Sequence, residues 1–578
     1  MAVMGEIYMV QLRRKPVSPP RGKIHTSIAE VISRTKNNSF YHKLSLRGDN
    51  PLYLLGTPKV IWPGSPSAGA ELVYGKVVAD GHILENPEND QNLWLGGDVW
   101  RATNLNNNWL EYLHSFRWLI DLHQAENQEG AKKRGQELVA AWIEQNNQWG
   151  AVSWGADVVG ERNTNWLLFA PLILDTEDLT YRRRVLDMIA RHARFLMNIS
   201  TNEREALNNL RAIVGLTLSG LFVPGGESWL KKGCSLLRKA VEKEVFADDA
   251  LRSQAPQKLL QLYLSFVLLG EAFKKTGREE PEEVLLATLR MATNLENIIH
   301  GDGKLALFNG VGIQGDEDIH LALLRTGQKD NKAEISEQSG FARIEKRKSL
   351  IIIDVGPPPE LDKSAASHCG THAFEMSRGR ERLVVNCGAA PFINGSKASL
   401  ISRDLRGSAA HSTLVLNNKN SSKIREDGLI GPGVSKVSSR MIEGHGQVLI
   451  ESEHDGYVLS CGYLHKRLIY VSETGENVRG EDIIEHHEMR KNLDKVPFNI
   501  RFHLHPDVSV TQNKQEEMLC LSLESGELWY FRYRGAEGSL ESSTYFGKEG
   551  KGSASKQIVL SGETGEVITT VLWSLQLE

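Results

Sequence analysis

The sequence has few cysteines, and they are scattered. Five cysteines occur in 578 residues, and none of them forms a C-x-x-C pair. An odd, dispersed set argues against a disulfide framework and against a thiolate zinc site. We therefore expect free thiols that are mostly buried.

The sequence also lacks long apolar runs and an excess of basic charge. No stretch reaches about 18 uninterrupted apolar residues, so no membrane-spanning helix is expected. The amino-terminal segment MAVMGEIYMVQLRRKPVSPPRG places Glu6 inside its apolar run and its arginines after the run, the reverse of a secretory signal. With 68 Lys+Arg against 72 Asp+Glu, the chain has no basic field of the kind that attracts nucleic acid.

The first half of the chain has the periodicity of helices. A length of 578 residues exceeds what one hydrophobic core usually organises, so more than one domain is expected. From about residue 90 to 300 apolar residues recur at helical spacing, as in PEEVLLATLRMATNLENIIH, where Val284, Met291 and Leu295 share a stripe. Short Gly, Asn and Pro breaks between such segments favour paired antiparallel helices.

The second half has the sequence pattern of β-strands. After about residue 340, short β-branched runs such as SLIIIDVG and RLIYVSE alternate with Gly, Asn and Ser turns. In PFNIRFHLHPDV the apolar residues Phe498, Ile500 and Phe502 alternate with polar ones, which is typical of a half-buried strand. We predict an α+β multidomain chain: an all-α region followed by an antiparallel β-sandwich. A cleft between two such layers would suit an extended polymer.

Histidines gather in one part of the second half. The stretch SHCGTHAFEMSRGRERLVVNCG contains His368, His372 and Asn386, and His411 follows in RGSAAHSTLVL. The even spacing of His368 and His372 would put both on one side of a strand. A sandwich could bring His368, Asn386 and His411 together, and imidazoles suit Zn²⁺. The alternative is that each histidine is a structural residue with satisfied hydrogen bonds.

These segments resemble the heparinase II/III-like family, in its bacterial branch. HCGTHAFEMSRGRERLVVNCG resembles the family's H-x-D-x-x-S-F-E-L followed by V-V-D-x-G, and RGSAAHSTLVL resembles its R-x-T-x-A-H-N-T-V. The resemblance covers roughly residues 50 to 578. It implies an (α/α) toroid over residues 46–325 and a C-terminal β-sandwich over 326–578. Pro16, Pro19 and Pro20 suggest an extended lead-in over residues 1–45.

The resemblance also implies a site, with departures from the family pattern. The zinc ligands carry over as His368, Asn386 and His411, with Asn386 standing where the family usually has Asp. That replacement removes a negative charge and should weaken the binding of a metal ion. The histidine that active lyases place two residues before the first ligand corresponds to Ala366, and Lys258 stands at or near the place of the lyase tyrosine.

The implied reaction is β-elimination of a uronate glycan, which needs three placed groups. One group must neutralise the substrate carboxylate, one must abstract the neighbouring proton, and one must protonate the leaving oxygen. The resemblance nominates Asn208 or Asn209 for the carboxylate. Lys258 and His372 are the candidate acid/base groups, and the expected substrate-binding residues are Arg162, Asn165 and His503.

Two functions are therefore predicted from the sequence. The first is a polysaccharide lyase-like protein that acts on acidic, uronate-containing glycans with zinc as its expected metal. The alternative is a catalytically impaired glycan-binding or structural protein of the same fold, and hydrolysis by other groups stays open as a third possibility.

The expected partner is an acidic polysaccharide and not nucleic acid. The resemblance implies the cell envelope or periplasm, whereas the absence of a visible signal favours the cytoplasm.

Overall fold

The structure is a computed structural model that describes residues 46–578 except 62–63, 80–81, 89, 104, 201–208, 245–253, 313–318, 320–333, 336–338, 391–397, 488–494, 514–517 and 549–551. Residues 49–578 form one compact unit. The predicted lead-in over residues 1–45 lies outside the described residues.

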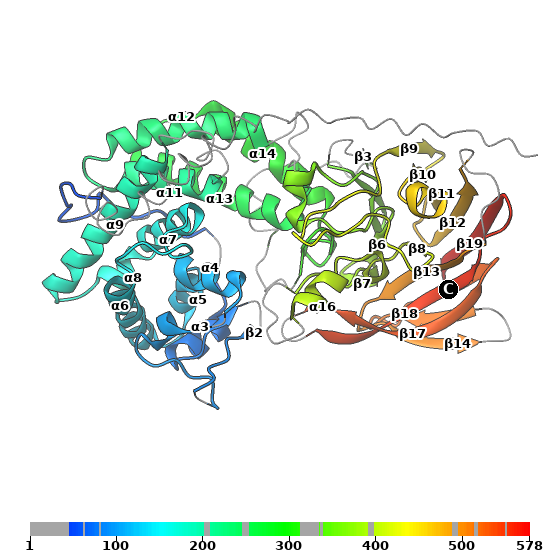
Figure 1. The fold of residues 1–578 in the computed structure, drawn as a ribbon, viewed down its shortest axis with the longest axis horizontal. Helices are drawn as coiled ribbons and strands as arrows, with labels where there is room; N and C mark the ends of the chain where they lie inside the picture. The colour runs from blue at the N-terminus through cyan, green and yellow to red at the C-terminus, as the bar shows by residue number, and fades with distance from the viewer. Residues whose placement is uncertain are drawn as a thin grey trace, which may run out of the picture. The chain divides into compact units, whose positions relative to one another are not determined.

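Helices occupy the N-terminal half, as the periodicity predicted (Figure 1). They are accompanied by the short strands β1 (Val78–Ala79) and β2 (His82–Ile83). The helices are α3 (Pro66–Val73), η1 (Asp98–Arg101), α4 (Asn107–Ser115), α5 (Leu119–Gln124), α6 (Gln128–Gln145), α7 (Ala156–Leu168), α8 (Ala170–Leu174), α9 (Leu179–Ile199), α11 (Leu210–Phe222), α12 (Glu227–Glu244), α13 (Pro256–Thr276) and α14 (Glu282–Asn297).

Local sequence explains where these helices begin and end. The side chain of Asp178 accepts hydrogen bonds from the amides of Thr180 and Tyr181 and so caps the start of α9. Pro256 occupies the first turn of α13, where its missing N–H costs nothing. Gly277 ends α13 in the left-handed conformation, with φ of 63°.

Two glycines allow α7 and α11 to pack closely. A Cβ atom at Gly160 would lie 2.3 Å from the carbonyl oxygen of Arg211, and one at Gly215 would lie 2.5 Å from the carbonyl oxygen of Gly160. Backbone atoms cannot yield to such contacts as a flexible side chain can. The close approach of these helices, which carry much of the polar cluster described below, therefore depends on residues without a side chain.

Strands occupy the C-terminal half. Among the described residues, one antiparallel sheet has the order β14-β15-β16-β19-β12-β11-β10-β9, and a second has the order β17-β18-β13-β7-β6-β5-β4-β3, with β8 also paired to β13. The strands of the second sheet are β3 (Glu334–Ile335), β4 (Phe341–Lys346), β5 (Ser349–Asp354), β6 (Phe374–Arg378), β7 (Glu381–Val385), β8 (Leu414–Leu416), β13 (Pro497–Leu504), β17 (Glu537–Tyr545) and β18 (Ser553–Glu563).

The first sheet consists of β9 (Val437–Gly444), β10 (Gln447–His454), β11 (Tyr463–Val471), β12 (Asn477–His486), β14 (Ser509–Asn513), β15 (Met518–Ser522), β16 (Leu528–Arg534) and β19 (Ile568–Leu577). Short helices lie between strands: η2 (Leu361–Ala366), α16 (Ala398–Asp404), η3 (Ser408–Ala410) and α17 (Val458–Cys461).

The two sheets pack face to face around a shared core. Phe374 on β6 stacks on Trp573 on β19, with ring centroids 5.4 Å apart, and Phe502 on β13 lies 5.0 Å from Phe531 on β16. These four aromatic side chains belong to one buried cluster. The predicted antiparallel sandwich is therefore confirmed, because apolar residues of both sheets bury one another.

The cysteines have the predicted free state. All five are free, and Cys369, Cys387 and Cys461 are buried. Burial raises the pKa of the Cys369 thiol to about 12 and that of the Cys387 thiol to about 11. Both thiols are therefore protonated at neutral pH.

The helices contain no membrane span within the described part of the chain, because none is both long enough and apolar enough to cross a bilayer.

Replacing Gly160 tests the close packing of α7 on α11. We expect Gly160→Ala to lower the free energy of unfolding by roughly 1–3 kcal/mol, since the added methyl group overlaps backbone atoms. Gly444→Ala on β9 is the control, because a Cβ there meets nothing within 4 Å. Urea denaturation would check both variants, and an unchanged midpoint for Gly160→Ala would contradict the packing argument.

Candidate functional site

His368 and His411 come together, as the sequence predicted. His368 follows η2 and His411 follows η3, and the Nδ1 atom of His368 lies 3.0 Å from the Nε2 atom of His411. The two side chains are 5% and 1% exposed. The loops around the two short 3₁₀ helices therefore place this pair inside the protein.

The hydrogen bonds of this pair use all four ring nitrogens. The amide of Gly310 donates to Nε2 of His368 at 3.1 Å, so the proton of His368 is on Nδ1 and is donated to His411. His411 in turn donates from Nδ1 to the carbonyl oxygen of Gly407 at 2.7 Å. Burial lowers the pKa of His411 to about 4, and burial with the neighbouring His411 lowers the pKa of His368 well below its usual value. Both rings are therefore neutral near pH 7.

Asn386 is hydrogen-bonded to the residue that follows His411. Its Oδ1 atom accepts a hydrogen bond from the amide of Ser412 at 2.9 Å, and its buried Nδ2 atom has no partner. A Cβ atom at Gly370, where the resembled motif has Asp, would lie 2.9 Å from the His411 ring, so a carboxylate has no room there. The ligand atoms of His368, Asn386 and His411 are occupied by hydrogen bonds in this structure, so zinc binding by this set stays a prediction.

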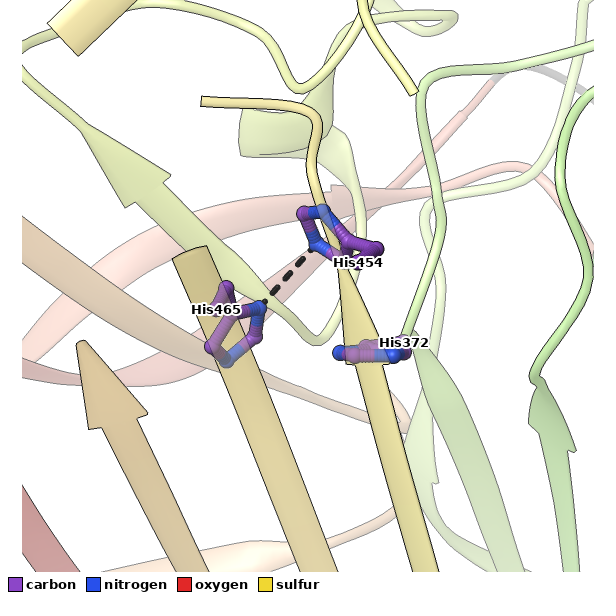
Figure 2. Close-up of side chains that lie close together, drawn as sticks. All are labelled: His372, His454 and His465. Carbon is purple, nitrogen blue, oxygen red and sulfur yellow. Dashed lines mark hydrogen bonds between the residues drawn. The ribbon is translucent and has the colours of Figure 1, made fainter. Parts of the chain in front are cut away.

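His372 lies apart from the pair, in the core of the sandwich. It has no exposed surface, and its φ of +66° breaks the regular alternation that would have put it beside His368. Its imidazole lies with those of His454 on β10 and His465 on β11, and one ring nitrogen from each lies within 4.8 Å of the others (Figure 2). The prediction of His372 as a substrate-facing base conflicts with this burial.

Arg162 and Asn165, the predicted substrate-binding residues of the helical half, are buried in the helical core. Arg162 is fully buried, with its guanidinium 4.1 Å from the centre of the Trp142 ring. It donates to the carbonyl oxygens of His114 and Ser153, each at 2.8 Å. Asn165 is 9% exposed and donates to the carbonyl oxygen of Ser115. Both side chains therefore hold helices together, because their polar atoms bond to backbone groups.

Of the other helical candidates, Asn208 lies outside the described residues. Asn209 is the half-buried N-cap residue of α11. Lys258 is exposed on the first turns of α13. Their predicted roles toward a substrate carboxylate and a proton stay predictions.

A polar cluster in the helical half was missed by the sequence reasoning. Glu161 on α7 accepts two hydrogen bonds from Arg117 and pairs with Arg211 on α11 at 3.3 Å. One turn before Glu161, the Oδ1 atom of Asp157 is buried without a partner, and burial raises the pKa of Asp157 although the Arg211 and Lys258 cations oppose this. The i, i+4 spacing of Asp157 and Glu161 on one helix face was the available signal.

His503 has a structural position. It is 3% exposed, its Nδ1 atom lies 2.7 Å from the hydroxyl of Ser543, and its Nε2 atom donates to the carbonyl oxygen of Ala409 at 3.0 Å. Burial lowers the pKa of His503 to about 3. A neutral ring that holds η3 in place explains this residue without a substrate.

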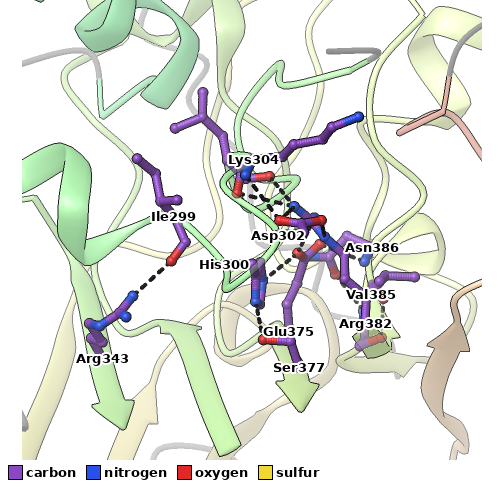
Figure 3. Close-up of polar contacts among 12 residues, drawn as sticks. Ile299, His300, Asp302, Lys304, Arg343, Glu375, Ser377, Arg382, Val385 and Asn386 are labelled. Carbon is purple, nitrogen blue, oxygen red and sulfur yellow. Dashed lines mark hydrogen bonds and ion pairs between the residues drawn. The ribbon is translucent and has the colours of Figure 1, made fainter. Parts of the chain in front are cut away.

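A buried carboxylate fastens the segment after α14 to the sandwich (Figure 3). Glu375 on β6 faces the Nε2 atom of His300 at 3.1 Å and the guanidinium of Arg382 at 3.4 Å. Arg382 also makes two hydrogen bonds to Asp302. The other oxygen of Glu375 accepts from the amide of Asn386 at 2.8 Å. The carboxylate thus sets the backbone position from which Asn386 extends.

A basic pocket of about 530 Å³ lies in the sandwich half. Its lining includes the cations Arg403, Lys419 and Lys423 and the single carboxylate of Asp404, together with serine hydroxyls and glycine backbone. Gly407 and Ala409, which accept hydrogen bonds from His411 and His503, also line it. The pocket has the size of a small-molecule site and an excess of positive charge.

The buried neutral state of His411 predicts a dependence of stability on pH. An unfolded histidine titrates near pH 6.5, whereas folded His411 does so at about 4. The unfolded chain therefore binds more protons in this window, and stability is lost as the pH falls through it, by up to about 1.4 kcal/mol per pH unit for each such ring. We expect His411→Gln to show a shallower loss of unfolding free energy between pH 6.5 and 4 in urea titrations. His445→Asn, at an exposed turn, should keep the wild-type slope; an unchanged slope in His411→Gln would contradict the assignment.

Comparison with known proteins supports the resemblance. Residues 330–574 match the family described as Heparinase II/III-like, C-terminal. FtsZ-localized protein C of Caulobacter vibrioides (strain NA1000 / CB15N) is 26% identical over 570 residues, covering 96% of this chain and 95% of that protein.

Solved structures share the fold over nearly the whole chain. The crystal structure of heparinase III has a TM-score of 0.70 at 13% identity and covers 95% of this chain and 91% of that one. Heparan sulfate lyase HepC from Pedobacter heparinus has a TM-score of 0.55 at 13% identity, with coverage of 88% and 82%. Residues 330–574, which contain most of the antiparallel sandwich, are thus similar to the C-terminal domain of the heparinase II/III-like family, and the whole chain shares the fold of heparinase III.

Proposed function

We propose that this protein binds an acidic glycan through its heparinase-like fold without cleaving it by β-elimination. The observation that carries this proposal is the burial of His372, the nominated base, which has no exposed surface. A base must come within hydrogen-bonding distance of the proton that it abstracts. His372 could do so only after the sandwich had opened.

The remaining acid/base positions support the same proposal. Ala366 has no proton to exchange at the position where the resemblance expects a histidine. Lys258, which stands at or near the place where the resemblance expects a tyrosine, is exposed, whereas a lysine that acts as a base is normally shielded from water. His368 and His411 are neutral, and their ring nitrogens are already hydrogen-bonded. Loss of one acid/base group alone costs on the order of 10²- to 10⁴-fold in rate.

Groups suited to binding an anion are present in the sandwich half. Arg403, Lys419 and Lys423 line the basic pocket against one carboxylate. Charged groups of this kind bind carboxylate or sulfate oxygens through charge-assisted hydrogen bonds. An acidic, uronate-containing polymer is therefore the partner that we propose.

A lyase assay tests the first part of this proposal. We expect no rise in ultraviolet absorbance from unsaturated uronate when the full-length protein is incubated with heparan sulfate, other glycosaminoglycans or alginate. Heparinase III in the same buffers is the positive control. Product formation above the buffer blank would overturn the proposal and would support the lyase function predicted first from the sequence.

Binding tests the second part. Lys419→Glu with Lys423→Glu should weaken binding of the same polymers by roughly tenfold or more, because two charge-assisted contacts are reversed. Lys556→Glu, an exposed change on β18, is the matched control. Isothermal titration or surface plasmon resonance would measure the affinities; equal affinities for all three proteins would contradict the use of this pocket.

A second candidate function is supported by the relative named FtsZ-localized protein C, which aligns with nearly the whole chain. We propose that this protein also localises with FtsZ and acts there as a binding protein and not as an enzyme. A sandwich whose catalytic positions are replaced is compatible with such a role. The cellular location of the chain is then set by FtsZ.

Co-purification tests this candidate. We expect tagged full-length protein to retain FtsZ from the same organism above the level of a tag-only control, and a fluorescent fusion to overlap the FtsZ signal in cells. Retention of FtsZ without any glycan binding would favour this candidate over the first. If FtsZ is not retained and the fluorescent signals do not overlap, the candidate is contradicted.

A further inference from the structure

Three buried imidazoles in the sandwich have the composition of a metal site. His454 and His465 are cross-strand partners on β10 and β11, and His372 comes just before β6. The three side chains are at most 2% exposed. One nitrogen of each lies within 4.8 Å of the other two, and Figure 2 shows the rings turned toward a common region.

The protons of His372 can be assigned from its neighbours. The hydroxyl of Ser439 donates to the carbonyl oxygen of Val355, so the hydroxyl of Ser452, 2.7 Å away, must donate to Ser439. Ser452 then accepts its bond from Nε2 of His372, also at 2.7 Å. The lone pair of His372 therefore lies on Nδ1, which is buried without a partner. A buried acceptor normally has a hydrogen-bond partner or a bound ion, so this nitrogen is available to bind a ligand.

His465 is held in the protonation state of a metal ligand. Its Nε2 atom donates to Asp482 at 2.8 Å, and that carboxylate is fixed by Arg467 and by the indole of Trp573. The lone pair of His465 is consequently on Nδ1, which faces His454 at 3.2 Å. A carboxylate behind an imidazole is the usual second partner of a zinc-bound histidine.

To bind a metal, His454 would have to move its proton from one ring nitrogen to the other. Its Nδ1 atom accepts from the amide of Gly456 at 3.0 Å, so Nε2 carries the proton that is donated to His465. Binding a metal through Nε2 moves this proton to Nδ1 and gives up two hydrogen bonds, the one from Gly456 and the one to His465. Two local hydrogen bonds are a small loss compared with the gain from several zinc–nitrogen bonds.

The backbone at His372 also indicates a special position. A histidine with φ of +66° is uncommon, and here it is held by hydrogen bonds from its amide to the carbonyl of Asp354 and from Arg467 to its own carbonyl. Such conformations persist where surrounding contacts enforce them, often at functional sites. This backbone turns the ring toward His454 and His465.

We propose that His372, His454 and His465 together bind one zinc ion in the core of the sandwich. Three neutral imidazoles suit Zn²⁺, and a solvent-derived ligand completes the coordination. The ion would join the segment before β6 to β10 and β11, and so link the two sheets. This site is separate from the His368 and His411 pair, and the inference does not depend on the proposed glycan or FtsZ binding.

Metal analysis of paired variants tests the proposal. The full-length protein, purified without a polyhistidine tag or chelators from zinc-supplemented cells, should contain one equivalent of zinc per chain by plasma mass spectrometry. His372→Asn should lose most of this zinc, whereas His368→Asn should keep it. Zinc lost from His368→Asn and kept by His372→Asn would overturn the assignment, as would a wild-type protein without zinc.

A cobalt measurement keeps the test valid if one variant folds poorly. Wild-type protein from cobalt-supplemented cells should show the visible absorption bands of tetrahedral Co²⁺ with nitrogen ligands. His465→Asn should lose these bands while its circular dichroism shows that the sandwich is intact. Bands that persist in a folded His465→Asn protein would overturn the proposal.

Discussion

The buried carboxylate of Glu375 is the interaction on which the arrangement of this protein depends. A carboxylate removed from water is costly unless cations and hydrogen-bond donors surround it. Glu375 meets this requirement with His300, Arg382 and the amide of Asn386, which come from the segment after α14 and from β7 and its end. Satisfying one charge therefore holds the end of the helical half, the second sheet and the loop of the candidate site in one arrangement.

The fold could be predicted from the sequence because its periodicities are simple. The stripe of Val284 and Met291 predicted α14, and the alternation of Phe498 and Ile500 predicted β13; all four side chains are buried. Hydrophobic burial acts on the spacing of residues along one element, and that spacing can be read without tertiary information. The pairing order of the strands could not be read in this way.

The candidate site was predictable only in part. The convergence of His368 and His411 followed from the family motifs, but their hydrogen-bond partners did not, because Gly310 and Gly407 contribute backbone atoms that any residue type possesses. His372 was misplaced because even spacing assumes a regular strand, and a positive φ removes that regularity. Arg162 was expected to bind substrate, whereas stacking on Trp142 lets its guanidinium lie in the core.

Two of the three buried thiols in the C-terminal half, those of Cys369 and Cys387, have a low reactivity that follows from their burial. Cys369 and Cys387 are protonated at neutral pH because their surroundings disfavour the thiolate, and the thiolate is the species that reacts with oxidants and alkylating reagents. Peroxide or maleimide would therefore modify them only when the loops packed around them open locally. The rate of that modification would report how often this half of the molecule opens.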